Sequence, residues 1–274
     1  MTEELSEFVG SITTAVTRRA DIYVELLDEA DLRGTLAAEE QECLDRFETY
    51  AADILERYVP PGPRRRDSLV FAHLYAAEPQ TEPGARRHAL LTALFAAEAE
   101  ARGPLRLTQA QSIRLAEVFR RLGSGLLADR LVLHAALAFD RAAKLYQQVG
   151  DPRARDVCLL AQARARHRAP GRGALRVLET LSSVLCGYGY QPYRLLGWVV
   201  FQLAAFSLAL GLISPIPVPR ILYMCLANYL NPLGLGDVAE VPQSGWVLLV
   251  AEGYVGAVTL SVFFALLVRR WFRG

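Results

Sequence analysis

Cysteine and histidine are scarce in this sequence of 274 residues, and cysteine is scattered as well. The four cysteines form no C-x-x-C pair, and they are Cys43, Cys158, Cys186 and Cys225. Neither a zinc site nor a disulfide framework is therefore expected. The charged part of the chain is predicted to be reduced and hence cytoplasmic.

The sequence also lacks the patterns of common enzyme sites. Its four histidines have no metal-ligand spacing, and they are His73, His88, His134 and His167. No glycine-rich phosphate loop or nucleophile elbow is found. His134, in an apolar helical stretch, is interpreted as a packing residue rather than a base. We therefore expect no enzymatic activity, no cofactor and no resident metal.

Charge is nearly balanced but unevenly spread. The net charge is +1, which argues against nucleic acid as a partner because that binding needs a concentrated basic surface. Charged residues are frequent up to about residue 173 and rare between Arg194 and Arg269. This change predicts a cytoplasmic helical domain at residues 1–170, a linker with an interfacial helix at 171–194, and a membrane domain at 195–274.

The first domain has the periodicity of amphipathic helices. They are expected at residues 5–32, 37–58, 85–101, 108–122 and 126–149. Gly123-Ser124-Gly125 is taken as a break between the last two. Residues 135–166, with a Gly150-Asp151-Pro152 turn, resemble one tetratricopeptide-type hairpin, although a repeat array needs about three. We therefore predict a domain of antiparallel helical hairpins, which binds a cytoplasmic protein or ligand regulator or assembles with copies of itself.

Two long apolar runs dominate the membrane domain, at residues 195–213 and 246–268. At a rise of about 1.5 Å per residue, each helix could cross a hydrocarbon core of roughly 30 Å. The connector at 214–245 is largely apolar and is expected to dip back into the lipid bilayer. Its only charges are Arg220, Asp237 and Glu240. Arginines precede the first run and follow the second, so the positive-inside rule predicts that both termini are cytoplasmic.

Residues 232–237 in the connector read Pro-Leu-Gly-Leu-Gly-Asp. Lying between two predicted spans, this stretch resembles the pore domain of the potassium-channel superfamily, whose filters read Thr-Val-Gly-Tyr-Gly-Asp. The resemblance is to bacterial members with two spans per subunit, and it covers roughly residues 185–273. It implies an all-α pore domain with a re-entrant pore helix from Arg220 to about Leu230, a filter loop and an inner helix. It also implies a homotetramer, because each chain carries one pore loop.

The resemblance gives roles to particular residues. The filter would coordinate ions through backbone carbonyls, at Pro232, Leu233, Gly234, Leu235 and Gly236. Asp237 would stand at the outer mouth, hydrogen-bonded to Asn228 of the pore helix, or would be a solvated loop acid. Glu252 would brace the pore helix behind the filter, or would reach water at the interface. Gly256 would be the hinge of the inner helix, or a packing site.

Two positions depart from the family pattern. Pro232 replaces a threonine that contributes oxygen ligands, and Leu235 replaces the tyrosine that supports the filter. We expect a homotetrameric cation channel of the cell membrane, with potassium as the expected ion and K⁺ or Na⁺ as the permeant species. The alternatives are a nonselective cation pore that depolarises the membrane and a membrane-anchored helical scaffold that does not conduct.

Overall fold

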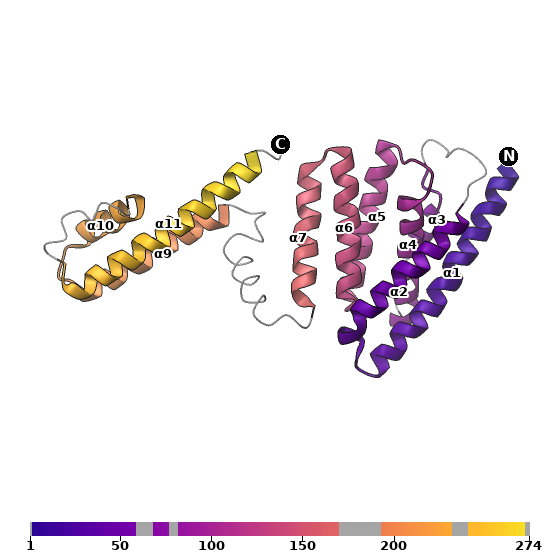
Figure 1. Cartoon of the computed structure of the whole chain (residues 1–274), viewed down its shortest axis with the longest axis horizontal. Coiled ribbons are helices and arrows are strands. Elements are labelled where there is room, and N and C mark those ends of the chain that lie inside the picture. Colours follow the sequence, from indigo (N-terminus) through magenta and orange to yellow (C-terminus); the bar gives the residue numbers. More distant parts are fainter. Residues whose placement is uncertain (1, 59–67, 77–81, 170–192, 232–240, 272–274) are drawn as a thin grey trace. The chain divides into compact units, whose positions relative to one another are not determined.

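The structure is a computed structural model that describes residues 2–58, 68–76, 82–169, 193–231 and 241–271 (Figure 1). Every regular element in these ranges is a helix. The predicted all-helical fold is therefore confirmed for this part of the chain. The chain divides into two compact units, Met1–Gly173 and Ala174–Gly274, each with its own set of helices.

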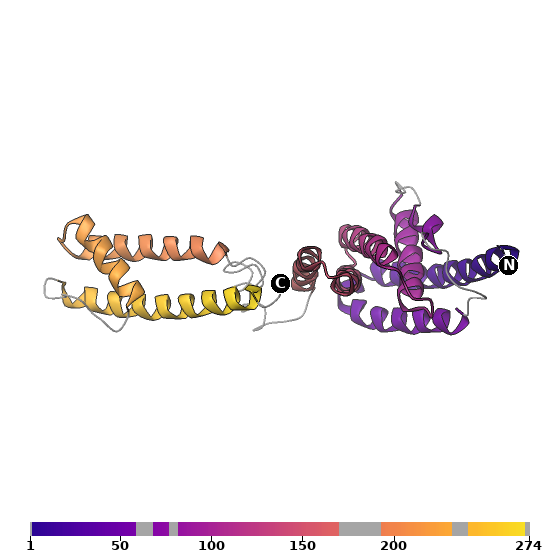
Figure 2. The ribbon, with the colours of Figure 1, turned by 90° about the horizontal axis from the view of Figure 1, so that it is seen from above.

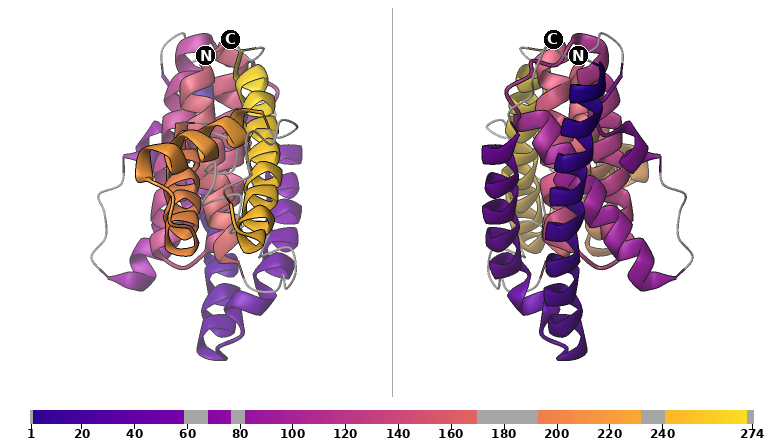
Figure 3. Two further views of the ribbon diagram at one scale, coloured as in Figure 1. Left: turned by 90° about the vertical axis from the view of Figure 1, so that its left-hand side faces the viewer. Right: turned by 90° about the vertical axis from the view of Figure 1, so that its right-hand side faces the viewer.

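The first unit begins with a helical hairpin. α1 (Thr2–Leu32) and α2 (Leu36–Arg57) are joined by a tight turn. Gly34 in this turn has a φ of 72°, a left-handed conformation that favours glycine. Both helices pack against α4 (Pro83–Arg102), and the short helix α3 (Ala72–Tyr75) also contacts α4 (Figures 1 and 3).

Helix α4 is buried on all sides over the stretch from Leu91 to Glu100. The ring of Phe95 stacks on Phe47 of α2, with centroids 4.3 Å apart. It also meets the ring of Tyr23 of α1 edge-on, at 5.7 Å. These rings join α1, α2 and α4 because large aromatic side chains bury much apolar area at each contact.

Three further antiparallel helices complete the first unit, namely α5 (Gln109–Ala128), α6 (Val132–Val149) and α7 (Pro152–Arg168). α6 ends at Val149 and is followed by Gly150, whose φ is 79°. Asp151 then caps α7, because its side chain accepts a hydrogen bond from the amide of Ala154 at 3.0 Å. Pro152 occupies the first turn, where its missing N–H costs no helical hydrogen bond.

The predicted break at Gly123-Ser124-Gly125 is wrong. α5 continues through these residues to Ala128. A Cβ on Gly123 would lie 2.8 Å from the ring of Phe139 in α6, and one on Gly125 would lie 2.7 Å from the side chain of Leu90 in α4. The two glycines thus allow α5 to approach both neighbouring helices closely, and their role is packing rather than chain reversal.

The second unit contains α9 (Tyr193–Ile213), α10 (Val218–Leu230) and α11 (Gln243–Trp271). α9 and α11 lie side by side and antiparallel, while α10 folds back against both (Figure 2). A small apolar cluster joins the three, made by Leu210, Ile221, Cys225, Val241 and Leu249. The segments Leu195–Ile213 and Gly245–Ala265 are long and apolar enough to cross a membrane.

The predicted elements of the second unit can be compared with these helices. The apolar runs at residues 195–213 and 246–268 lie within α9 and α11. The short helix expected from Arg220 starts slightly earlier, at Val218. The predicted filter at 232–236, Asp237 and nearly all of the predicted linker at 171–194 lie outside the described residues.

Candidate functional site

The candidate site is built around α10. Pro217 precedes this helix and Pro219 lies in its first turn, where a missing N–H is tolerated. One face of α10 is buried, through Ile221, Cys225, Asn228 and Tyr229. These positions follow the spacing of a single helical face, which is pressed against α9 and α11. The opposite face carries exposed apolar side chains, at Leu222, Tyr223, Leu226 and Leu230.

Asn228 ties α10 to α11. Its Nδ2 donates to the carbonyl oxygen of Leu249 at 2.7 Å and to Oε2 of Glu252 at 3.2 Å. Both hydrogens of this amide are therefore used. Glu252 is only 1% exposed, whereas a carboxylate that reached interfacial water would be exposed. The structure thus brings together Asn228 and Glu252, which the sequence analysis named separately, and Asp237 lies outside the described residues.

Further polar groups surround this pair. The thiol of Cys225 lies against Ser207 of α9 and against Glu252. Oε1 of Glu252 accepts no hydrogen bond of ordinary geometry from the described residues. Asn228 is therefore its main partner in the described part of the chain, because a thiol is only a weak donor.

A second polar contact joins α9 directly to α11. Nε2 of Gln202 lies 3.4 Å from Oγ1 of Thr259, and this hydroxyl donates to the carbonyl oxygen of Val255 at 2.7 Å. Both side chains are buried, at 8% exposure each. The sequence analysis missed this pair. The detectable signal was the small number of polar residues in the two apolar runs, since polar groups inside such a unit must find partners.

Gly256 lies where the ring of Tyr229 packs on α11. A Cβ at this position would come within 2.8 Å of Cδ2 of that ring. α11 runs unbroken through Gly256. The structure therefore gives this glycine a packing role in the described conformation, and its role as a hinge stays a prediction.

The outer surface of the second unit is apolar. Only 17% of the Leu195–Ile213 segment and 28% of the Gly245–Ala265 segment are buried. The core helix of a soluble protein would be mostly buried. Large apolar side chains cover the exposed faces of these two helices, among them Val200, Phe201, Leu208, Leu212, Val247, Tyr254 and Val258. A continuous apolar surface of this kind marks an interaction with lipid or with another protein.

In the first unit, the imidazole of His134 is held by partners in the core. It is fully buried, with Nε2 at 2.6 Å from the hydroxyl of Tyr23 and Nδ1 at 3.0 Å from Oε1 of Glu40. The same Glu40 oxygen accepts the backbone N–H of Leu133 at 2.7 Å. Glu40 is therefore a hydrogen-bond partner both for backbone N–H groups in the first turn of α6 and for the imidazole of His134. Within the described residues, no group of histidine, cysteine and acidic side chains is arranged to hold a metal ion.

Two arginines form ion pairs with acidic side chains in the first unit, and of these acids Glu98 is fully buried. Arg87 of α4 contacts Asp28 and Asp31 of α1 and also Asp129 after α5, at 2.6, 2.9 and 2.7 Å. Burial alone would lower the pKa of Arg87, but hydrogen bonds and charges from the aspartates raise it above its ordinary value. Burial raises the pKa of Glu98, which Arg141 opposes from 2.7 Å. These ion pairs connect neighbouring helices of the first unit.

Comparison of the chain with protein-family models, with curated proteins and with solved structures gives no match. Inference about its function therefore depends on its own residues and their arrangement.

Proposed function

We propose that this chain is one subunit of a homotetrameric cation channel in the cell membrane, with potassium as the expected ion. The observation that carries the proposal is the construction of the second unit. Two helices long enough to span a membrane expose apolar side chains, while a short helix between them is fixed to α11 through Asn228 and Glu252. Polar contacts inside and apolar side chains outside suit a protein surrounded by lipid.

In this proposal α10 is the re-entrant pore helix. Its last carbonyls carry the negative end of the helix dipole, which favours a cation near Leu230. The filter would follow directly, with ions passing the backbone oxygens of Leu233 to Gly236. Gly234 and Gly236 suit this role because glycine reaches backbone conformations that other residues avoid. The first unit would assemble the tetramer or receive a cytoplasmic regulator.

A nonselective cation pore is the second candidate function, and two residues favour it. Pro232 has no N–H and a fixed φ, and Leu235 has no hydroxyl to hold the filter in place. A filter with weaker support would discriminate less well between K⁺ and Na⁺. The third candidate, a non-conducting scaffold, is favoured by the size of the first unit and its many helices.

Ion flux into proteoliposomes tests these functions. We expect proteoliposomes that contain the purified chain to take up K⁺. We expect Gly234→Ala or Gly236→Ala to abolish this uptake, because a Cβ would disturb the ring of backbone carbonyls. Gly197→Ala is the matched control: it lies in α9, and a Cβ there has no neighbour within 4 Å. Its flux should equal that of the unaltered chain.

Each candidate predicts a different result. K⁺ flux well above Na⁺ flux supports the potassium channel, and equal fluxes support the nonselective pore. An intact tetramer, shown by cross-linking, that passes neither ion supports the scaffold. Equal flux through the Gly236→Ala variant and the unaltered chain would place the conduction path elsewhere and overturn the proposed filter.

A further inference from the structure

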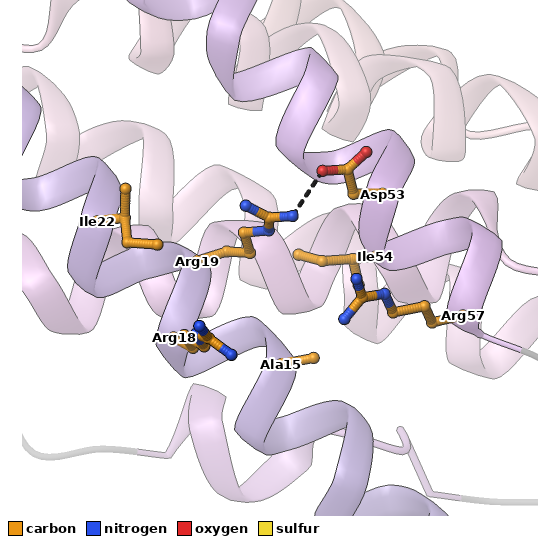
Figure 4. A pocket seen from close by; sticks show the side chains of 7 residues that line it. All are labelled: Ala15, Arg18, Arg19, Ile22, Asp53, Ile54 and Arg57. Carbon is orange, nitrogen blue, oxygen red and sulfur yellow. Dashed lines mark hydrogen bonds and ion pairs between the residues drawn. The ribbon is translucent and has the colours of Figure 1, made fainter.

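A surface hollow in the first unit lies between α1 and α2 and has a volume of about 180 Å³ (Figure 4). It is lined by Ala15, Arg18, Arg19, Ile22, Asp53, Ile54 and Arg57. With three arginines and one aspartate, the lining has an excess of positive charge. Nothing in the proposed channel requires such a feature.

Arg19 is held in place on two sides. Its Nη2 lies 2.8 Å from Oδ2 of Asp53. Its guanidinium carbon also lies 5.1 Å from the centre of the Tyr50 ring, in a cation–π contact. A guanidinium that is already ordered loses little freedom when it binds a ligand.

Arg18 and Arg57 differ from the other arginines described above. Neither forms an ion pair with any described residue, and both are exposed. Figure 4 shows that their guanidinium groups border the same space as that of Arg19. Arg87 and Arg141, in contrast, are neutralised by aspartate and glutamate. The positive charge of the hollow is therefore available to an anion from solution.

The chemistry and size of the hollow favour a particular anion. The planar fork of arginine matches the oxygens of a phosphate group, and several arginines around one space suit its double charge. The volume is below the roughly 300–1,000 Å³ of pockets that enclose whole drug-sized ligands. Ala15, Ile22 and Ile54 provide an apolar wall for carbon atoms next to the phosphate.

We infer that this hollow binds the terminal phosphate of a phosphomonoester. The inference does not depend on ion conduction. Two sources share this chemistry, a soluble phosphorylated metabolite and a phosphate-bearing lipid headgroup.

Calorimetric titration of the full chain in detergent tests the site. The probes are glycerol 3-phosphate for a soluble source and short-chain phosphatidate for a lipid source. We expect Arg18→Gln/Arg57→Gln to weaken binding about tenfold or more, because two charge-assisted hydrogen-bond partners are lost. Arg153→Gln/Arg155→Gln on α7 removes the same charge far along the chain and should leave the affinity unchanged. Equal melting temperatures of both variants would show that folding is preserved.

The outcomes separate the sources and can overturn the inference. Binding of both probes indicates that the phosphate alone is recognised, whereas binding of phosphatidate alone indicates a lipid headgroup. Loss of affinity in the Arg18/Arg57 variant supports the site in either case. Absence of binding by both probes, equal weakening in the two double variants, or equally strong competition by acetate would overturn it.

Discussion

The two units of this chain differ in where their large apolar side chains lie: the first unit buries many of them, and the second exposes many of them. In the first unit, Phe47 and Phe95 are fully buried. In the second, Leu208 is 67% and Tyr254 is 77% exposed, while polar Asn228 is 6% exposed. Both units are helical, so the fold class alone does not explain the difference. The contrast supports an apolar surrounding for the second unit.

The two units also differ in the partners of their buried ionisable side chains. In the first, Arg87 and Glu98 have partners of opposite charge. In the second, Glu252 contacts the neutral amide of Asn228 and the thiol of Cys225. An uncompensated ion is costly in either place, but the cost is highest where no water is near. A carboxyl whose partners among the described residues are all neutral is therefore the more unusual of the two arrangements and the better candidate for a functional role.

The largest expected effect tests the buried core of the first unit. Phe95→Ala should lower its free energy of unfolding by about 3–5 kcal/mol, because a fully buried ring is replaced by a cavity. Alkylation of Cys43 and Cys158, both buried in this unit, measures its opening. Burial raises the pKa of Cys158 to about 11, so its thiol reacts slowly at pH 8 until the unit opens.

Val157→Ala is the control for this measurement, because Val157 is 59% exposed on α7. It should change the free energy of unfolding by about 0.5 kcal/mol or less. Equal alkylation rates in the Phe95→Ala and Val157→Ala variants would mean that α4 does not hold the unit together.

The next effect tests whether the exposed side of α11 meets lipid. Val258→Arg should disfavour membrane integration by about 2.5–3.5 kcal/mol, the cost of arginine near the centre of a spanning helix. Val157→Arg in the first unit introduces the same residue at nearly the same exposure, 59% against 56%, and should have no such effect. The fraction of chain that stays in membranes after an alkaline wash measures both. Full retention of the Val258→Arg variant would show that this face does not meet lipid.

The sequence could predict those elements that depend on local pattern. The long apolar runs predicted α9 and α11 because length and hydropathy need no knowledge of packing. Pro217 and Pro219 likewise indicated where α10 begins. The break expected at Gly123 was wrong because a glycine can serve either a turn or a close helix contact. Only the neighbouring ring of Phe139 distinguishes the two.

The candidate sites depend on residues that are distant in the chain. Gln202 and Thr259 meet because α9 and α11 are antiparallel at a particular register, which no single-helix pattern fixes. The same holds for Arg18 and Arg57, which border one hollow only because α1 and α2 form a hairpin. The sequence could name Asn228 and Glu252 as separate candidates, yet their contact and the bond to the Leu249 carbonyl required the structure.

The smallest expected effect concerns Glu252. Glu252→Ala removes the acceptor that faces Asn228 and should destabilise the second unit by about 1–3 kcal/mol, a shift on the order of 10 °C in its melting temperature. Glu252→Gln keeps an acceptor oxygen and should melt close to the unaltered chain. Tryptophan fluorescence in detergent isolates this unit, because all three tryptophans, Trp198, Trp246 and Trp271, belong to it. Equal losses in both variants would mean that the carboxyl itself, rather than an acceptor for Asn228, holds α10 to α11.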